Sequence, residues 1–266
     1  VSPHFSADGR RIAFESNRGG AGIQIWVANA DGTGLTQLTR DFSEHCGSPA
    51  WSPDGTRLAF DSQGSDGRWQ VWVMDADGGN QRRLTQDAGD SAVPAWSRDG
   101  GEIYFFSNRS GRPQIWRAPV SGGPAEQITR NGGYIAAESL DGKSLYFTAT
   151  GEDGLWALSL ANGQEEKQII SEPIAARAIA VTESGIYYLT EKRKEEAAGN
   201  WEPLVASTIR RRYDIRLWDP RARLSRTVGE LEGPIHQGLA VSPDGLTFVF
   251  SRVMPDADIM LIENLH

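Results

Sequence analysis

The chain has 266 residues, and its 27 Lys and Arg against 35 Asp and Glu leave a net charge of −8. Because nucleic-acid binding depends on basic side chains that neutralise phosphates, this balance argues against DNA or RNA as a partner of the chain as a whole. The 30 Gly and 13 Pro exceed what helix interiors tolerate, the single Cys46 excludes an internal disulfide, and no apolar run is long enough to span a membrane.

One sequence unit recurs six times along the chain. A short segment of small residues and Pro leads into a Ser-x-Asp-Gly turn, which is followed by an apolar run such as 58–60, an alternating stretch such as 70–74 and a short polar segment such as 82–85. These features predict an innermost strand, a fully buried second strand, a half-buried third strand and a polar outer strand. The turn stands at 6–9, 52–55, 97–100, 139–142, 242–245 and, in a degenerate form, 182–185.

The spacing of the units predicts the architecture. An apolar residue followed by Trp marks the third strand at 25–26, 71–72, 115–116, 155–156 and 217–218, and Ile259-Met260 takes this place in the last unit. Successive marks lie 46, 44, 40, 62 and 42 residues apart, and four of these gaps fit the period of about 40–50 residues of a four-stranded propeller blade.

We therefore predict an all-β protein with one β-propeller domain over 1–266. It is expected to contain six four-stranded blades, of which the last lacks its outer strand. The blades are expected at about 1–40, 41–86, 87–130, 131–171, 172–230 and 231–266.

Two segments carry a resemblance to a known family. Residues 49–55 read Pro-Ala-Trp-Ser-Pro-Asp-Gly, and residues 94–100 depart from this pattern only at Arg98. The pattern resembles that of the TolB-like (WD40-like) β-propeller repeat family, and the resemblance covers nearly the whole chain. Similar propellers form the C-terminal part of bacterial winged-helix transcriptional regulators and occur in periplasmic Tol-system proteins. The resemblance implies a bacterial protein in the periplasm or otherwise outside the cytoplasm, with a cytoplasmic location as the alternative.

The chain begins at an innermost strand and ends after a third strand. A closed ring would take the missing outer strand from residues upstream of Val1. We therefore expect a covalently linked N-terminal segment or domain in the full-length protein.

Enzyme signatures are absent from the sequence. It contains no Gly-x-Ser-x-Gly nucleophile motif and no His-Glu-x-x-His zinc motif. No catalytic residue, cofactor or resident metal is therefore predicted. The four histidines leave one alternative open, which is a metal held by His45, His236 and a neighbouring carboxylate.

Binding residues are expected in the loops at one end of the propeller channel. Loops from an outer strand to the next inner strand, and from a second to a third strand, emerge on the same face, and their residues are not set by the repeat. Together they would form a polar funnel at the channel mouth, a default ligand site. The alternative is that they are ordinary solvated loop residues. The candidates are Glu44, His45, Asp90, Tyr134, Arg177, His236 and Gln237.

The gap of 62 residues contains a long loop, 190–212, on that same face. Long loops inside compact folds are usually functional or disordered. A basic arm anchored by an aromatic side chain would suit an acidic peptide or partner surface. A solvated excursion without a binding role is the alternative. The residues of this partner arm are Lys192, Arg193, Lys194, Trp201, Arg210, Arg211 and Arg212.

These observations favour a non-catalytic binding or sensing module of a larger bacterial protein. It would engage a peptide, a protein partner or a small ligand at the channel mouth and signal to an attached domain. The alternative is the propeller domain of an enzyme, either a prolyl-oligopeptidase-like peptidase that lacks its hydrolase domain here or a metal-dependent lyase or lactonase.

Overall fold

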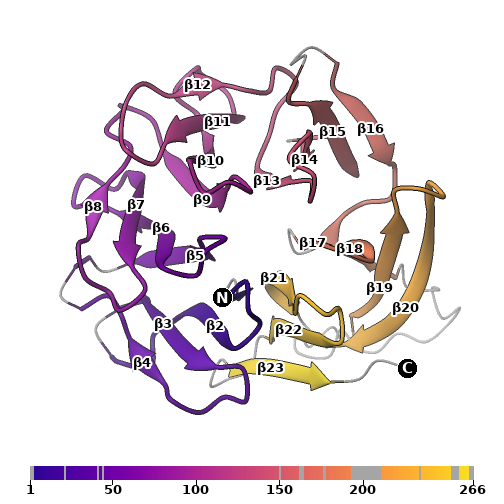
Figure 1. Cartoon of the computed structure of the whole chain (residues 1–266), viewed down its shortest axis with the longest axis horizontal. Coiled ribbons are helices and arrows are strands. Elements are labelled where there is room, and N and C mark those ends of the chain that lie inside the picture. The colour runs from indigo at the N-terminus through magenta and orange to yellow at the C-terminus, as the bar shows by residue number, and fades with distance from the viewer. Residues whose placement is uncertain are drawn as a thin grey trace, which may run out of the picture.

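The computed structural model describes residues 3–20, 22–40, 42–43, 45–149, 151–161, 165–175, 178–192, 211–233, 235–252 and 258–263, and of 236, 237, 252 and 258–263 it describes the backbone alone. These residues form antiparallel sheets arranged in a ring around a central channel axis (Figure 1), with no α-helix among them. No helix in the described residues is long and apolar enough to cross a membrane.

Five sheets have four strands each, ordered from the innermost strand near the axis to the outer strand at the rim. The first contains β1 (His4–Phe5), β2 (Arg11–Ser16), β3 (Gln24–Asn29) and β4 (Thr36–Gln37). The second contains β5 (Cys46–Trp51), β6 (Arg57–Gln63), β7 (Trp69–Asp75) and β8 (Arg82–Arg83). The third contains β9 (Ser91–Trp96), β10 (Glu102–Ser107), β11 (Gln114–Pro119) and β12 (Glu126–Gln127).

The fourth and fifth sheets repeat this order. The fourth contains β13 (Ile135–Glu138), β14 (Ser144–Thr148), β15 (Leu155–Ser159) and β16 (Lys167–Ile170). The fifth contains β17 (Ile179–Thr182), β18 (Gly185–Glu191), β19 (Arg212–Asp219) and β20 (Leu224–Glu232), and its last two strands are the longest of the ring.

The last sheet is incomplete. It contains β21 (Ile235–Val241), β22 (Thr247–Arg252) and β23 (Asp258–Glu263), and no fourth strand pairs with β23 among the described residues. The predicted all-β propeller is confirmed. Within the described residues five blades are complete, and the last unit, which carries the turn and third-strand marks, has three strands and no outer strand.

The Ser-x-Asp-Gly segments close the hairpin between each inner and second strand. Ser52 Oγ donates to Asp54 Oδ1 at 2.6 Å, the Thr56 N–H donates to the same oxygen at 3.0 Å, and Gly55 has a φ of 67°. The Ser52 hydrogen bond is the largest of the effects that lower the pKa of Asp54 to about 2. The same Ser-to-Asp bond recurs at Asp8, Asp99, Asp141 and Asp244. These carboxylates therefore stabilise the turn that recurs in these five units.

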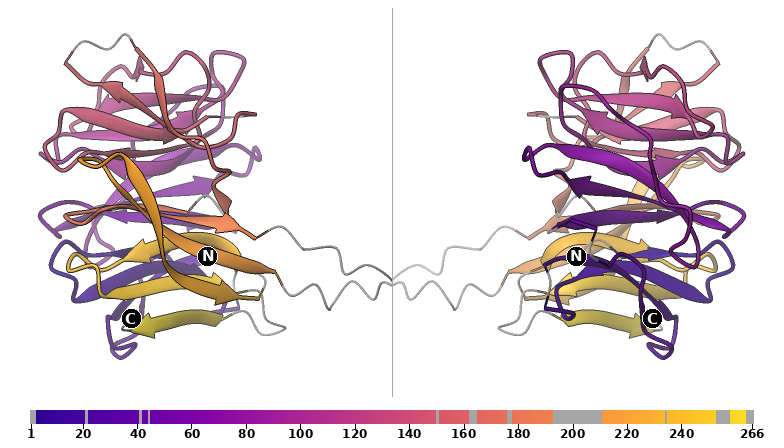
Figure 2. Two further views of the ribbon diagram at one scale, coloured as in Figure 1. Left: turned by 90° about the vertical axis from the view of Figure 1, so that its right-hand side faces the viewer. Right: turned by 90° about the vertical axis from the view of Figure 1, so that its left-hand side faces the viewer.

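The hydrophobic core lies between neighbouring sheets. Leu58 and Phe60 of the second blade are fully buried and pack in one cluster with Ala13 and Ile25 of the first. Side chains of adjacent blades interdigitate in this way around the ring, so each second strand reads as a continuous apolar run. Seen from the side, the strands run roughly along the propeller axis and the loops gather on two opposite faces (Figure 2).

Candidate binding face

Two faces of the propeller are distinguished by their loops. The mouth face carries the loops from each outer strand to the next inner strand, such as 84–90, and from each second to third strand, such as 64–68. The turn face carries the Ser-x-Asp-Gly turns, such as 52–55.

Three predicted funnel residues lie on the mouth face in successive blades: His45, Asp90 and Tyr134. Glu44 and Arg177 lie outside the described residues. Positions 236 and 237 belong to the inner strand β21 instead of the expected loop, and only their backbone is described. His45 packs edge-to-face against Trp69, with ring centroids 4.7 Å apart.

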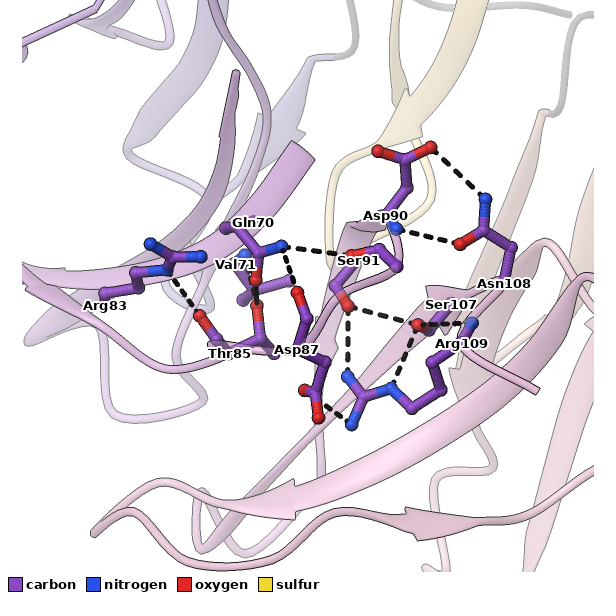
Figure 3. Close-up of polar contacts among 11 residues, drawn as sticks. Gln70, Val71, Arg83, Thr85, Asp87, Asp90, Ser91, Ser107, Asn108 and Arg109 are labelled. Atoms are coloured by element: carbon purple, nitrogen blue, oxygen red, sulfur yellow. Dashed lines mark hydrogen bonds and ion pairs between the residues drawn. The ribbon is translucent and has the colours of Figure 1, made fainter. Parts of the chain in front are cut away.

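Asp90 joins the second blade to the third. Its Oδ1 accepts the Trp69 N–H at 3.0 Å and its Oδ2 accepts the Asn108 side-chain N–H at 3.2 Å. The Asp90 N–H in turn donates to Asn108 Oδ1 at 2.8 Å (Figure 3). Both carboxylate oxygens are therefore engaged in holding two loops together.

Arg109 is fixed near Asp90 by an ion pair and hydrogen bonds (Figure 3) and by contact with aromatic rings. It forms a 2.7 Å ion pair with Asp87 and donates to Ser107 and Ser91 at 3.0 Å each. Its guanidinium carbon also lies 4.7 Å from the ring centroid of Trp116. All three side-chain nitrogen atoms of Arg109 are engaged within the protein, so the side chain holds the loop and has few N–H groups left for a ligand.

The same Arg arrangement occurs in the first blade. Residues 16–18 and 107–109 both read Ser-Asn-Arg, and Arg18 Nε donates to Ser16 Oγ at 3.0 Å. The Arg18 guanidinium lies over the Trp26 ring at 5.7 Å. The motif is thus part of the repeat.

A buried Gln and a Thr anchor the outer-to-inner loop from below (Figure 3). Thr85 Oγ1 accepts the Val71 N–H at 2.9 Å and donates to Gln70 Oε1 at 2.7 Å. Gln70 Nε2 then donates to the Gly89 carbonyl at 3.0 Å. Gln114 and Thr129 form the same pair in the third blade. The backbone of the outer-to-inner loop is therefore held in the same way in both blades.

Two carboxylates meet at the mouth-face end of the inner strands, a feature that the sequence did not reveal. Asp61 is 3% exposed and its Oδ2 accepts the Val93 N–H at 2.8 Å, while Glu15 Oε2 accepts the Ser48 N–H at 3.2 Å. A Cβ on Gly47 would lie 2.6 Å from Glu15 Oε2 and 2.9 Å from Asp61 Oδ1, so any other residue here would have to displace a carboxylate.

The carboxylates stabilise unusual backbone. Ser48 and Val93 have φ values of 49° and 54°, in the left-handed region that a β-branched residue rarely adopts. In both inner strands, the N–H of the residue with positive φ donates to a carboxylate on the second strand of the preceding blade. The pKa of Asp61 is raised to about 6, mainly because the carboxyl group is buried and to a smaller extent because the negatively charged Glu15 lies nearby.

A cavity of about 240 Å³ opens beside Tyr134. The Tyr134 ring packs on Phe106 with centroids 4.9 Å apart. The cavity is also lined by the hairpin loop of the fourth blade, which carries the exposed Glu152 and Asp153. The other lining residues are Thr148, Ala149, Gly154 and Ile174.

The acidic hairpin is held at its base. The Asp153 carbonyl accepts the Gln168 side-chain N–H at 2.9 Å, and Gly154 has a φ of 90° with the Ile170 carbonyl where a Cβ would be. Glu152, Asp153 and Tyr134 therefore line one cavity, and the hairpin that carries the two acidic residues is held at its base. Carboxylates and an aromatic face are the groups that attract an ammonium or guanidinium ion.

The described residues of the partner arm form ion pairs within the fifth blade. Lys192 Nζ lies 3.1 Å from Asp214 and 2.6 Å from Glu230. Arg212 pairs with Glu232 at 3.0 Å, and Arg211 with Glu191 at 3.7 Å. The basic residues at the base of the arm are thus neutralised by the strands that carry it. Arg193, Lys194, Trp201 and Arg210 lie outside the described residues.

With this geometry established, the chain can be compared with known proteins. Residues 1–197 match the family model described as the TolB beta propeller domain. The chain belongs to this family. No curated protein matches the sequence.

Solved structures share the fold. TolB from Acinetobacter baumannii matches with a TM-score of 0.75 at 19% identity, over 97% of this chain and 62% of that chain. A putative TolB from Agrobacterium tumefaciens matches with a TM-score of 0.68 at 18% identity, over 98% and 89%. An oligogalacturonate lyase in complex with manganese matches with a TM-score of 0.65 at 14% identity, over 98% and 73%. At these identities the likeness shows the fold alone.

Proposed function

We propose that this TolB-family propeller is a non-catalytic binding or sensing module of a larger bacterial protein. It engages a peptide, a protein partner or a small ligand through its mouth face. The cavity beside Tyr134 carries the proposal, because one aromatic and two acidic residues line it on the mouth face. Family membership supports a periplasmic or otherwise extracytoplasmic location as part of the same proposal.

The chemistry of the cavity favours a cationic group on the ligand. Glu152 and Asp153 supply two negative charges beside the Tyr134 ring, and a volume of about 240 Å³ suits one long side chain. A Lys or Arg side chain or a free amine would combine charge pairing with a cation–π contact. The net charge of −8 would also speed the approach of a basic ligand.

Selection from a displayed hexapeptide library, followed by fluorescence polarisation with the enriched peptides, tests the proposal. We expect enrichment of Lys or Arg. We also expect Tyr134→Ala and the double variant Glu152→Gln/Asp153→Asn to weaken binding at least tenfold, about 1.4 kcal/mol. Asp66→Asn, in a mouth-face hairpin of the second blade, is the matched control and should bind as the parent does. Equal binding by all variants would remove the cavity from the proposal.

The enzyme alternative is tested separately. The purified protein would be supplied with manganese and oligogalacturonate, and the unsaturated product followed by ultraviolet absorbance. Fluorogenic aminoacyl and peptidyl substrates would report peptidase activity. Turnover above that of a heat-denatured sample would overturn the non-catalytic assignment. The described residues contain no group of three His, Cys, Asp or Glu side chains placed to hold a metal.

A further inference from the structure

A second cavity, of about 410 Å³, lies on the turn face at the seam where the last blade meets the first. The two blades are neighbours in the ring, as the indigo and yellow strands of Figure 1 show. The lining residues come mainly from the Ser-x-Asp-Gly turns at 6–9 and 242–245 and from the start of the β3–β4 turn. Ligand sites commonly have volumes of roughly 300–1,000 Å³, so this cavity, the seam groove, can hold part of a peptide.

The seam groove is open where one turn of the first blade is uncovered. In the second blade the equivalent β7–β8 turn packs on the blade before it, since a Cβ on Gly78 would lie 2.9 Å from the Leu38 carbonyl oxygen. A Cβ on Gly32, at the same place in the first blade, would have no described atom within 4 Å. The two Ser-x-Asp-Gly turns do touch, because a Cβ on Gly9 would lie 3.2 Å from Pro243 Cδ. The groove is therefore bounded by this turn contact and left open at the β3–β4 turn.

Three carboxylates line the groove, and each has one oxygen committed to its own turn. Oδ1 accepts a hydroxyl at 2.6 Å in Asp8 and in Asp31, it accepts the Ser242 hydroxyl in Asp244, and in all three it also accepts a backbone N–H. The hydroxyl hydrogen bonds are the largest of the effects that lower the pKa of these groups, so all three are ionised at neutral pH. Within the described residues Oδ2 of each forms no hydrogen bond or ion pair, and it can bind a cation while Oδ1 holds the turn.

Exposed apolar side chains adjoin the groove. The turn face also carries the turns from each third strand to the outer strand, and the large apolar side chains that are exposed among the described residues all lie on this face: Leu35, Leu140, Leu224 and Leu246. Leu246 is 58% exposed and stands between the lining residues Asp244 and Thr247, and Leu35 follows Asp31 in the β3–β4 turn. Apolar side chains grouped beside polar ones are typical of a surface that binds another protein.

We propose that the seam groove binds a basic peptide segment of a partner protein, one that carries apolar residues beside its Lys or Arg. The cationic side chains pair with Asp8, Asp31 and Asp244, and the apolar ones pack against Pro243 and Leu246. Within the described residues no three acidic side chains are placed to hold one metal ion. Acids spread over three turns suit several cationic groups on one chain. The site lies on the face opposite Tyr134 and goes beyond the function proposed above.

Fluorescence polarisation with a labelled hexapeptide of alternating Lys and Leu tests this site. The parent should bind it saturably with a Kd below about 1 mM, and a hexapeptide with Glu in place of Lys should not bind. Asp31→Asn/Asp244→Asn should weaken binding at least tenfold, and Leu246→Ser at least threefold. Each variant is also measured in the Glu152→Gln/Asp153→Asn background, which removes the charges of the mouth-face cavity and should leave this binding unchanged.

The repeat supplies matched controls. Asp54→Asn/Asp77→Asn makes the same two changes in the equivalent turns of the second blade, and Leu140→Ser removes an exposed leucine from the turn face of the fourth. Both should bind the peptide as the parent does, and thermal melting followed by circular dichroism shows that all variants are folded.

Three results would overturn the site. They are the absence of saturable binding by the parent, equal affinity in the two double variants, and binding that is lost only with the mouth-face substitutions. Binding by the 266-residue chain but not by a longer form of the protein would show that the groove is filled by the protein's own chain, and would overturn a partner site as well. Because the mouth-face background is measured separately, failure here is distinguishable from failure of the function proposed above.

Discussion

Replacing Asp61 with Asn should remove a large part of the pH dependence of stability between about pH 4 and pH 7. Asp61 is 3% exposed and lies near Glu15, and its pKa rises from 3.8 to about 6 in the folded protein. An acid whose pKa is raised by folding binds more protons in the folded state within this window. Its protonated form is therefore compatible with folding, and stability falls as the pH rises from 3.8 through about 6.

The size of the effect follows from the pKa shift. One pKa unit corresponds to 1.36 kcal/mol, so a shift of about two units corresponds to about 3 kcal/mol of stability lost between the two ends of the window. Asn keeps an acceptor for the Val93 N–H and stays neutral at every pH. Any hydrogen bond that Asn fails to make changes stability by a constant amount and does not alter the slope.

Urea unfolding followed by tryptophan fluorescence at several pH values measures this difference. The stability of Asp61→Asn relative to the parent should increase by about 3 kcal/mol from pH 4 to pH 7, since all other titrating groups are common to both proteins. Asp66→Asn, at an exposed carboxylate of the same blade, should run parallel to the parent. A constant difference between Asp61→Asn and the parent across the window would show that Asp61 titrates normally and that the reasoning is wrong.

Three further substitutions test the repeat and its loops by the same unfolding assay. Arg109→Ala should destabilise the protein by about 1–3 kcal/mol, because two hydrogen bonds and the ion pair of the largely buried guanidinium with the exposed Asp87 are lost; no change would show that the loop does not need them. Gly47→Ala should cost about 1–3 kcal/mol or more through the clash with the two carboxylates, and a neutral result would contradict their close approach. Asp54→Asn should be less stable than the parent above pH 3.8, where the Asp54 carboxylate stabilises the turn. The parent loses this stability as the pH falls toward about 2, so the unfolding free energies of the two proteins should converge in strong acid.

The fold was readable from the sequence because each hairpin needs particular residue types. A carboxylate that accepts both a serine hydroxyl and a following N–H, next to a glycine with positive φ, leaves few alternatives to Ser-x-Asp-Gly. The length of the outer strands was not readable in this way. Outer strands such as β8 and β12 have only two residues, and so short a polar segment leaves no distinctive pattern.

The site was readable only in part. Gln70 and Thr85 stand 15 residues apart and meet across a hairpin, and the same pair recurs at 114 and 129, so a comparison of the units would have revealed the anchored loops. The burial of Asp61 depends on the inner strands of two blades at once, and the sequence around it shows only an acid at the end of an apolar run. The Tyr134 cavity likewise requires the packing of separate loops.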